Sequence, residues 1–453
     1  MRFAQKQRLL RLLFGFLLIT SFCIVAIRTM FYSPEKVDHE RSDVYLQLKE
    51  VSKEMEALSL STSTQPVTTT TTETPTTQTL PEIPIHIKEL FKAKQLNIVA
   101  LDPAILDCVT KGRCMLLTAS ESTQIGTFLK DTGEVRKVFE EHFKGSEWKI
   151  QVLSSLTAVV TRHYWEGYDR KMMISVIQKN NEKQYWMVEE NVKHEVEERA
   201  FDRFNTTMTH GIKIPANIPR FELWWKNGRF ISCNENLAEA FAANSSIIKD
   251  DHIKNLKVFT DMLLDSNQIP TLAFGTRWYR NCGVIPYTTD IDVSVHISQY
   301  NETFKESIRE NKDYRLLRFI GRKEHGLEFT AKIPGSPRNS RVDVFYLFPH
   351  NGTFDWASGT YPKGKDGWAR IRTLVPKYYN QPLCTGDVFG HLFFVPCNFL
   401  DVIEKGYGKT DWQKPQESYS HMGPGKMTFW DGYWNVTLDN ILDKFNFTYE
   451  DYQ

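Results

Sequence analysis

Apolar and polar positions alternate along two stretches in the second half of the chain. Residues 290–297 read DIDVSVHI, so aliphatic side chains occupy every second position. In a β-strand these face the core, while Asp290 and Asp292 project together from the other face. Residues 341–348 read RVDVFYLF and predict a second, mostly apolar strand that contains Asp343.

The first half of the globular chain has the pattern of a mixed α/β module. Leu96–Leu101 predicts a short strand, and a helix is expected to begin at Pro103. Further strands are predicted at Ile150–Val160 and Met172–Ile177. We find no catalytic constellation in this part, and interpret it as a structural or acceptor-recognition module.

Two local patterns separate this module from the rest of the chain. Residues 221–232 (FELWWKNGRFIS) place Asn227-Gly228 between alternating aromatic positions, which predicts a type I′ β-hairpin. Residues 237–264 predict one long helix. Together these elements indicate the α/β class with a mixed sheet, divided into domains at 84–232 and 233–453.

The N-terminus carries the longest apolar run. Residues 12–27 are free of charged side chains and follow four basic residues. Small residues of a cleavage site are lacking, so a retained signal anchor at 12–31 is favoured over a cleaved signal peptide. The basic residues orient 1–11 to the cytosol and place the rest of the chain in a lumen, as a type II membrane protein.

Residues 32–83 have the composition of a stem. Apolar residues at 44, 48, 51, 55 and 58 recur at helical steps, so this part is either an amphipathic helix or a solvated linker. Residues 61–79 (STSTQPVTTTTTETPTTQT) are rich in threonine. Such a segment buries too little apolar surface to fold, and we expect a disordered, O-glycosylated stalk.

Charge follows the same division. The 453-residue chain has 56 basic and 55 acidic side chains. Residues 1–32 have five basic and no acidic residues, and 33–85 have four basic and nine acidic ones. The globular remainder is therefore nearly neutral, which argues against a nucleic-acid partner.

Glycosylation signals and cysteines agree with a luminal location. Sequons begin at six asparagines: 205, 244, 301, 351, 435 and 446. Outside the membrane run there are six cysteines, at 108, 114, 233, 282, 384 and 397. An even number permits disulfides of open connectivity, or several could be buried thiols. The absence of a C-x-x-C pair argues against a cysteine-based zinc site.

Asp290, Asp292 and Asp343 are the candidate catalytic and metal-binding residues. Two carboxylates at i and i+2 on one strand repel each other, and a hard divalent cation relieves this repulsion. Asp343 is costly inside an apolar strand unless it is paired or binds a metal. The alternative is that Asp290 and Asp292 cap a turn in solvent. His296 shares their face, and we interpret it as a surface histidine.

Other candidates concern phosphate. Gly275 and Thr276 follow an apolar run, where backbone N–H groups and a hydroxyl can meet a phosphate; an ordinary helix start is the alternative. Arg280 and Lys409 are expected as further phosphate contacts. The segment Gly408-Lys409-Thr410 is no P-loop, because the first glycine of that motif is replaced by Ile403.

These blocks resemble the fukutin family, a branch of the LicD-like phosphotransferases with a nucleotidyltransferase fold. The resemblance rests on Gly275-Thr276, WYRNCGVIPYTTDIDVSV, RVDVFYLF and VPCNFLDVIEKGYGKTDW, and covers about Arg229–Trp434. By position, Asp290 and Asp292 match the family's metal-binding D-x-D, and Asp343 matches its third carboxylate. The chain departs from the family in that Gly-Thr runs directly into Arg277-Trp278-Tyr279.

The resemblance implies an enzyme of the Golgi or endoplasmic reticulum. It would use Mg²⁺ or Mn²⁺ to transfer an alditol phosphate, typically ribitol 5-phosphate from CDP-ribitol, to a glycoprotein glycan such as the O-mannosyl glycan of dystroglycan. A related transferase of the same pathway is a possible partner. The alternatives are phosphocholine transfer from CDP-choline, with an aromatic cage near Trp278 or Trp356, and a non-catalytic Golgi scaffold that binds glycans.

Overall fold

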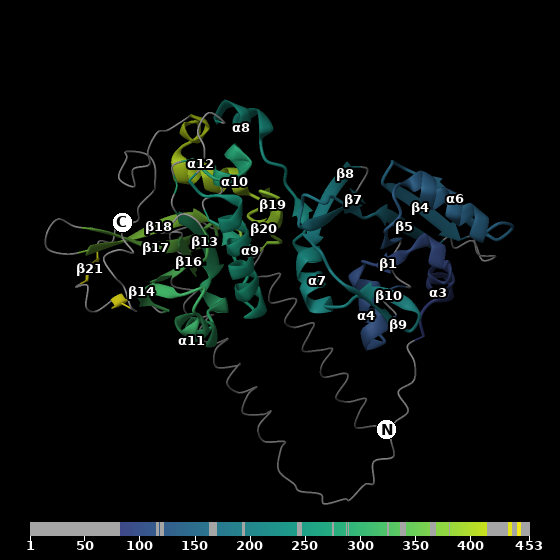
Figure 1. Cartoon of the computed structure of the whole chain (residues 1–453), viewed down its shortest axis with the longest axis horizontal. Coiled ribbons are helices and arrows are strands. Elements are labelled where there is room, and N and C mark those ends of the chain that lie inside the picture. Colours follow the sequence, from purple (N-terminus) through teal and green to yellow (C-terminus); the bar gives the residue numbers. More distant parts are fainter. Residues whose placement is uncertain are drawn as a thin grey trace, which may run out of the picture. The chain divides into compact units, whose positions relative to one another are not determined.

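The computed structural model describes residues 82–414, with short gaps, and two strands near the C-terminus at 434–436 and 442–444 (Figure 1). The gaps are residues 115–116, 118–121, 163–169, 193–194, 242–246, 274–275, 287, 289, 324–325, 336–340, 363–367 and 380. All described residues belong to one unit, Thr79–Gln453.

A five-stranded sheet in the order β1-β2-β5-β4-β3 opens this unit. Its strands are β1 (Ile98–Ala100), β2 (Ser122–Thr127), β3 (Trp148–Val152), β4 (Thr157–Arg162) and β5 (Arg170–Val176). The accompanying helices are α3 (Ile85–Lys92), α4 (Pro103–Lys111) and α6 (Thr132–His142). The predicted strands around β1 and β5 are confirmed, whereas the single strand predicted at 150–160 is two antiparallel strands joined by a turn.

The predicted helix start at Pro103 is confirmed, and local chemistry explains both ends of α4. The Asp102 carboxylate accepts a hydrogen bond from the Ala104 N–H at 2.8 Å, and Pro103 needs no partner in the first turn. Gly112 ends the helix with φ of 68°, a conformation that glycine adopts without strain.

The predicted hairpin at 221–232 is wrong. The segment forms α7 (Ile218–Lys226), followed after Gly228 by β11 (Arg229–Phe230). Buried Phe221, Trp224 and Trp225 have the i, i+3, i+4 spacing of a helix face, and Asn217 caps the first turn through Arg220 N–H. Helical packing of these rings therefore overrides the turn preference of Asn-Gly.

A large mixed sheet follows, in the order β21-β18-β17-β16-β13-β12-β20-β19-β11-β8-β7-β6, with β15, β14 and β22 extending from β16 (Figure 1). β13 pairs in parallel with β16 and antiparallel with β12, which confirms the α/β class with a mixed sheet. The strands are β6 (Gln178–Lys179), β7 (Tyr185–Val192), β8 (Glu195–Asp202), β12 (Thr271–Leu272), β13 (Asp290–His296), β14 (Leu316–Arg322), β15 (Gly326–Lys332), β16 (Arg341–Pro349), β17 (Phe354–Pro362), β18 (Trp368–Pro376), β19 (Cys384–Val388), β20 (His391–Val395), β21 (Trp434–Val436) and β22 (Leu442–Lys444). β9 (Thr206–Thr209) and β10 (Ile212–Pro215) form a separate pair.

This sheet crosses residue 232, the predicted domain boundary. β11 pairs in parallel with β19 and antiparallel with β8, so it joins strands from both predicted domains. The Trp224 ring stacks on Phe394 of β20 with centroids 4.1 Å apart. The boundary stays a prediction, and the contacts across it are extensive.

The long helix predicted at 237–264 is also wrong, because two helices occupy this range. They are α8 (Glu235–Phe241) and α9 (Asp250–Asp265), and residues 247–249 between them are not helical. Asp250 and Asp251 lie in the first turn of α9, where negative charge stabilises a helix start. Further helices are α10 (Thr276–Asn281), α11 (Glu302–Glu310) and α12 (Phe399–Tyr407).

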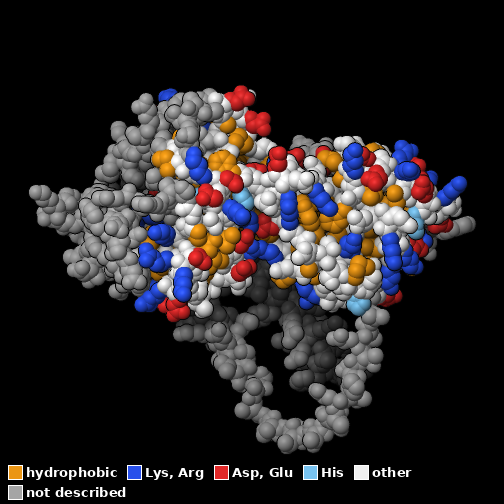
Figure 2. Space-filling model, in the orientation of Figure 1, with side chains coloured by type: hydrophobic (Ala, Val, Ile, Leu, Met, Phe, Trp, Pro, Cys, Tyr) orange, Lys and Arg blue, Asp and Glu red, His pale blue; other side chains and the backbone are white. Residues whose placement is uncertain are grey.

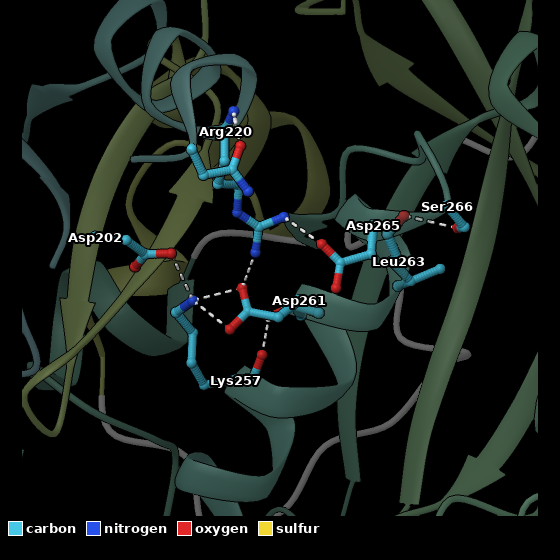
Figure 3. Close-up of polar contacts among 9 residues, drawn as sticks. Asp202, Arg220, Lys257, Asp261, Leu263, Asp265 and Ser266 are labelled. Carbon is cyan, nitrogen blue, oxygen red and sulfur yellow. Dashed lines mark hydrogen bonds and ion pairs between the residues drawn. The ribbon is translucent and has the colours of Figure 1, made fainter. Parts of the chain in front are cut away.

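A cluster of charged side chains ties α9 to β8 and α7 (Figure 3). The Lys257 ammonium lies 3.0 Å from an Asp202 carboxylate oxygen and 2.6 Å from one of Asp261. Arg220 of α7 pairs with Asp261 and, at 3.4 Å, with Asp265. Burial raises the pKa of Asp202, and the Lys257 charge opposes this shift. These pairs hold segments together that are far apart in sequence.

All six cysteines outside the predicted anchor form disulfides. The pairs are Cys108–Cys114, Cys233–Cys282 and Cys384–Cys397. Of the two alternatives that the sequence left open, the structure has disulfides and not buried thiols at these six positions, and it defines their connectivity.

Several N-terminal predictions lie outside the described residues: the tail at 1–11, the anchor at 12–31 and nearly all of the stem at 32–83. Within the described part of the chain, no helix is both long and apolar enough to span a membrane. Figure 2 shows basic and acidic side chains interspersed over the face in view, as expected for a nearly neutral globular part.

Candidate active site

Three carboxylates converge on neighbouring strands. Asp290 and Asp292 belong to β13 and Asp343 to β16, with Asp292 directly opposite Asp343 in the parallel register. One carboxylate oxygen from each of the three lies within 4.8 Å of the others. Such an all-oxygen group fits Mg²⁺ or Mn²⁺, and these three residues would be its protein ligands.

Alternation along β13 produces this arrangement as the sequence predicts. Ile291, Val293 and Val295 are buried, while Asp290 and Asp292 remain partly exposed on the other face. The strand is fixed at this point because the Ala273 N–H donates to the Asp292 carbonyl at 3.0 Å. The two aspartates therefore lie within a paired strand, not in the solvent-exposed turn that was the alternative.

Asp343 is more deeply buried than its two partners, with 7% of its surface exposed. Its Oδ1 accepts a hydrogen bond from the Thr330 hydroxyl and lies 3.6 Å from the Arg318 guanidinium. Sequence reasoning missed both neighbours. Their signal was the pair of apolar strands LLRFIGR and GLEFTAK, in which a partly exposed arginine and a buried glutamate and threonine need polar partners.

His296 is not part of the carboxylate group, which agrees with its interpretation as a surface histidine and not a ligand. Its ring stacks on Tyr379 with centroids 4.4 Å apart, and Nδ1 lies 2.7 Å from the Ser298 hydroxyl. Partial burial and the Lys377 charge lower the pKa of His296.

The structure gives no direct support for Gly275, Thr276 and Arg280 as phosphate contacts. Gly275 lies outside the described residues, and Thr276 is the first residue of α10. Arg280 is 5% exposed and donates to Asn281 at 2.9 Å and to the Trp412 carbonyl at 3.0 Å. This guanidinium holds α10 against the segment after α12, so the geometry gives it a structural task, and its phosphate contact stays a prediction.

Lys409 is exposed and lines a polar groove of about 820 Å³. The groove also includes Lys377 and Lys405, and none of the three aspartates lines it. The groove reaches Phe354 at the start of β17. The start of β17 pairs with the C-terminal end of β16, whereas Asp343 lies near the N-terminal end of β16. The structure thus does not bring Lys409 into the carboxylate group.

The aromatic rings considered for a choline cage are buried. Trp278 is 1% exposed and packs on Tyr279 and Phe399, and Trp356 is 7% exposed and stacks on Phe348. A cage for a quaternary ammonium needs open ring faces, which these core residues do not offer.

A mixed sheet that presents three aspartates from two adjacent strands is the architecture expected of a nucleotidyltransferase-type domain. Residues 275–398 match the LicD/FKTN/FKRP nucleotidyltransferase domain, and the matched range contains all three aspartates but not Lys409. This match and the similarity to the ribitol-5-phosphate transferases below support the resemblance to LicD-like proteins of the fukutin family that the sequence shows.

Relatives support this placement. An uncharacterized protein of Caenorhabditis elegans is 30% identical over 240 residues, covering 51% of this chain and 60% of the relative. The human ribitol-5-phosphate transferase FKTN is 26% identical over 255 residues, covering 51% of this chain and 53% of the relative. The mouse protein of the same name is 27% identical over 240 residues, covering 48% and 49%. The matched part thus spans from about half to 60% of each relative's length.

Proposed function

We propose that this protein is a metal-dependent transferase that moves an alditol phosphate, most simply ribitol 5-phosphate, from a CDP-linked donor to a glycan. The observation that carries the proposal is the convergence of Asp290, Asp292 and Asp343 within 4.8 Å. The similarity to ribitol-5-phosphate transferases supports the choice of the transferred group.

The proposed reaction is an in-line displacement at the donor phosphorus that bears the alditol. An acceptor hydroxyl oxygen forms the new P–O bond, the phosphoanhydride bond breaks, CMP leaves with the electron pair, and the hydroxyl proton passes to a base or to water. A divalent cation bound by the aspartates would neutralise charge on the diphosphate.

The chain's own residues supply position and charge. Asp290 and Asp292 project from one strand, so their spacing is fixed by the backbone and needs no loop to order first. Asp343 comes from the adjacent strand with one oxygen already held by Thr330. Charge stabilisation of this kind, without a covalent nucleophile, is what phosphoryl transfer mainly requires.

We also propose the cellular setting. The basic N-terminus followed by an apolar run supports a type II anchor in the Golgi or endoplasmic reticulum, with the catalytic part in the lumen. The three disulfides are consistent with an oxidising compartment. The acceptor would be a glycoprotein glycan, such as the O-mannosyl glycan of dystroglycan, and a related transferase is a candidate partner.

The test is CMP release by the full-length chain with Mn²⁺, an acceptor glycan and a panel of CDP-alditols and CDP-choline. We expect release with a CDP-alditol, and loss of at least about 100-fold in turnover for Asp292→Ala or in excess EDTA. Secretory transport and melting temperature of the variant should stay near those of the wild type.

Each rival function has its own outcome in this assay. CMP release with CDP-choline alone would identify a phosphocholine transferase. The structure does not favour this function, because Trp278 and Trp356 are buried. A chain that folds but binds neither CDP nor Mn²⁺ would be a non-catalytic glycan-binding partner. Unchanged turnover in Asp292→Ala would refute the carboxylate mechanism.

A further inference from the structure

Four residues form a row across four neighbouring strands at the candidate active site. Arg318 of β14 is opposite Thr330 of β15, Thr330 is opposite Asp343 of β16, and Asp343 is opposite Asp292 of β13. Residues directly opposite in paired strands share a face of the sheet. The row therefore connects an arginine to the carboxylate group through one threonine.

A β-bulge places the arginine in this row. The register of β14 against β15 shifts between Leu316, which is opposite Ala331, and Arg318, which is opposite Thr330. Leu317 is thus an extra residue in β14. Without this bulge the register would continue unshifted, so Leu317 would be opposite Thr330. Arg318 would then point to the other face of the sheet, because a shift of one residue exchanges the two faces of a strand. Bulges of this kind redirect side chains beside active sites.

The hydrogen bonds in the row have a defined direction. Arg318 Nε donates to the Thr330 hydroxyl oxygen at 2.6 Å, and that hydroxyl donates to Asp343 Oδ1. A threonine hydroxyl has one hydrogen, so accepting from Arg318 leaves that hydrogen for Asp343. The guanidinium also lies 3.6 Å from Asp343 Oδ1 and 3.3 Å from Oε1 of the buried Glu328.

We infer that Arg318 and Thr330 are positioning residues that fix Asp343 as a cation ligand. They hold one carboxylate oxygen and leave the second oxygen to bind the cation, and Glu328 anchors the guanidinium through the same Nη2 nitrogen that lies near Asp343. This assigns Asp343 to cation binding rather than to proton abstraction. The inference rests on the proposed function, since it takes the three aspartates as the metal site.

The test measures Mn²⁺ affinity without donor, from free Mn²⁺ in electron paramagnetic resonance, on the full-length chain. Thr330→Val keeps the shape of the side chain and removes the hydroxyl, and Arg318→Met removes the guanidinium. We expect each to weaken Mn²⁺ binding by roughly 10- to 100-fold, the usual effect of losing a group that orients a metal ligand. Arg318→Lys should weaken it as well, because lysine restores the charge but not the Nε geometry.

A matched control is Thr127→Val in the five-stranded sheet. Thr127 is also a buried strand threonine, and its hydroxyl donates to the Leu96 carbonyl at 2.6 Å. This variant should bind Mn²⁺ like the wild type. If Arg318→Met does not fold, Thr330→Val carries the test, and its melting temperature without Mn²⁺ can be compared with that of Thr127→Val.

The outcomes separate the inference from the proposed function. Mn²⁺ affinity within twofold of wild type in folded Thr330→Val would overturn the positioning role. Wild-type affinity in Arg318→Lys would show that Arg318 acts only through its positive charge, which would overturn its positioning role. If the wild type itself binds no Mn²⁺, or if Asp292→Ala binds it normally, the proposed metal site fails, and the inference fails with it.

Discussion

His252 is a buried titratable residue on α9 that the proposed chemistry does not use. It has no exposed surface, and neither ring nitrogen has a hydrogen-bond partner in the described structure. Burial lowers the pKa of His252 to about 4, and the nearby Asp251 carboxylate opposes the shift. The ring is thus neutral in the folded protein over a pH range in which an unfolded chain takes up a proton.

This histidine predicts a loss of stability in acid. Above pH 6.5 both states are neutral at His252, and as the pH falls from 6.5 towards 4 only the unfolded state binds the proton. The unfolding free energy should therefore fall by about 2 kcal/mol through this residue alone by pH 4.5. We expect His252→Leu to show a smaller fall in melting temperature between pH 7 and 4.5 than the wild type. An equal fall in both proteins would contradict this account.

The aspartates could be predicted from the sequence because each carboxylate interrupts an apolar strand pattern. The row through Thr330 and Arg318 could not, because it depends on strand pairing and on the extra residue Leu317. Neither the order of the strands nor a bulge is encoded in a local period of two. Finding the partners of Asp343 thus requires the sheet topology.

At the scale of elements, α7 shows why local patterns can mislead. The aromatic residues around Asn227 fit both an alternating and a helical pattern, and the Asn-Gly pair favoured the first interpretation. In the structure the Asn227 side chain closes the helix by donating to the Leu223 carbonyl at 2.8 Å, and its Oδ1 accepts from the Leu383 N–H at 2.8 Å. A contact with a segment 156 residues away decides its conformation.

Gly228 connects α7 to β11 and tolerates no side chain. A Cβ here would lie 2.6 Å from the Trp224 carbonyl oxygen and 2.8 Å from that of Ala200, and backbone atoms cannot move aside cheaply. Gly228→Ala should therefore lower the unfolding free energy by about 1–3 kcal/mol. Gly406→Ala is the matched control, because a Cβ there meets nothing within 4 Å and alanine favours α12 by up to about 1 kcal/mol. Thermal melts that rank Gly228→Ala at or above Gly406→Ala would refute the steric argument.

At the scale of the molecule, the two predicted domains share one sheet and one set of side-chain contacts. The charged cluster around Lys257 joins α9 to β8 and α7, and Trp224 stacks on Phe394. The domain boundary could be placed from the change of pattern near residue 233, but the dependence of one part on the other could not, since it arises from pairing between distant strands.

These contacts predict that the part proposed to be catalytic does not fold alone. A fragment of residues 233–453 lacks β11, so the edge of β19 loses its partner, and Phe394 and Leu383, now 2% and 4% exposed, lose their cover. Losing the Trp224 ring alone uncovers the Phe394 side chain, and exposing a buried phenylalanine costs roughly 1.5–3 kcal/mol. That is a large fraction of the stability of a typical domain.

We therefore expect residues 79–453 to be secreted as a folded protein with a cooperative melt, and residues 233–453 to aggregate or to lack near-ultraviolet circular dichroism. Both fragments should be expressed with the same signal sequence, so that disulfides form in both. A cooperative melt and Mn²⁺ binding by residues 233–453 would show an autonomous catalytic domain. The first module would then be an attached recognition unit rather than part of the fold that holds the aspartates in place.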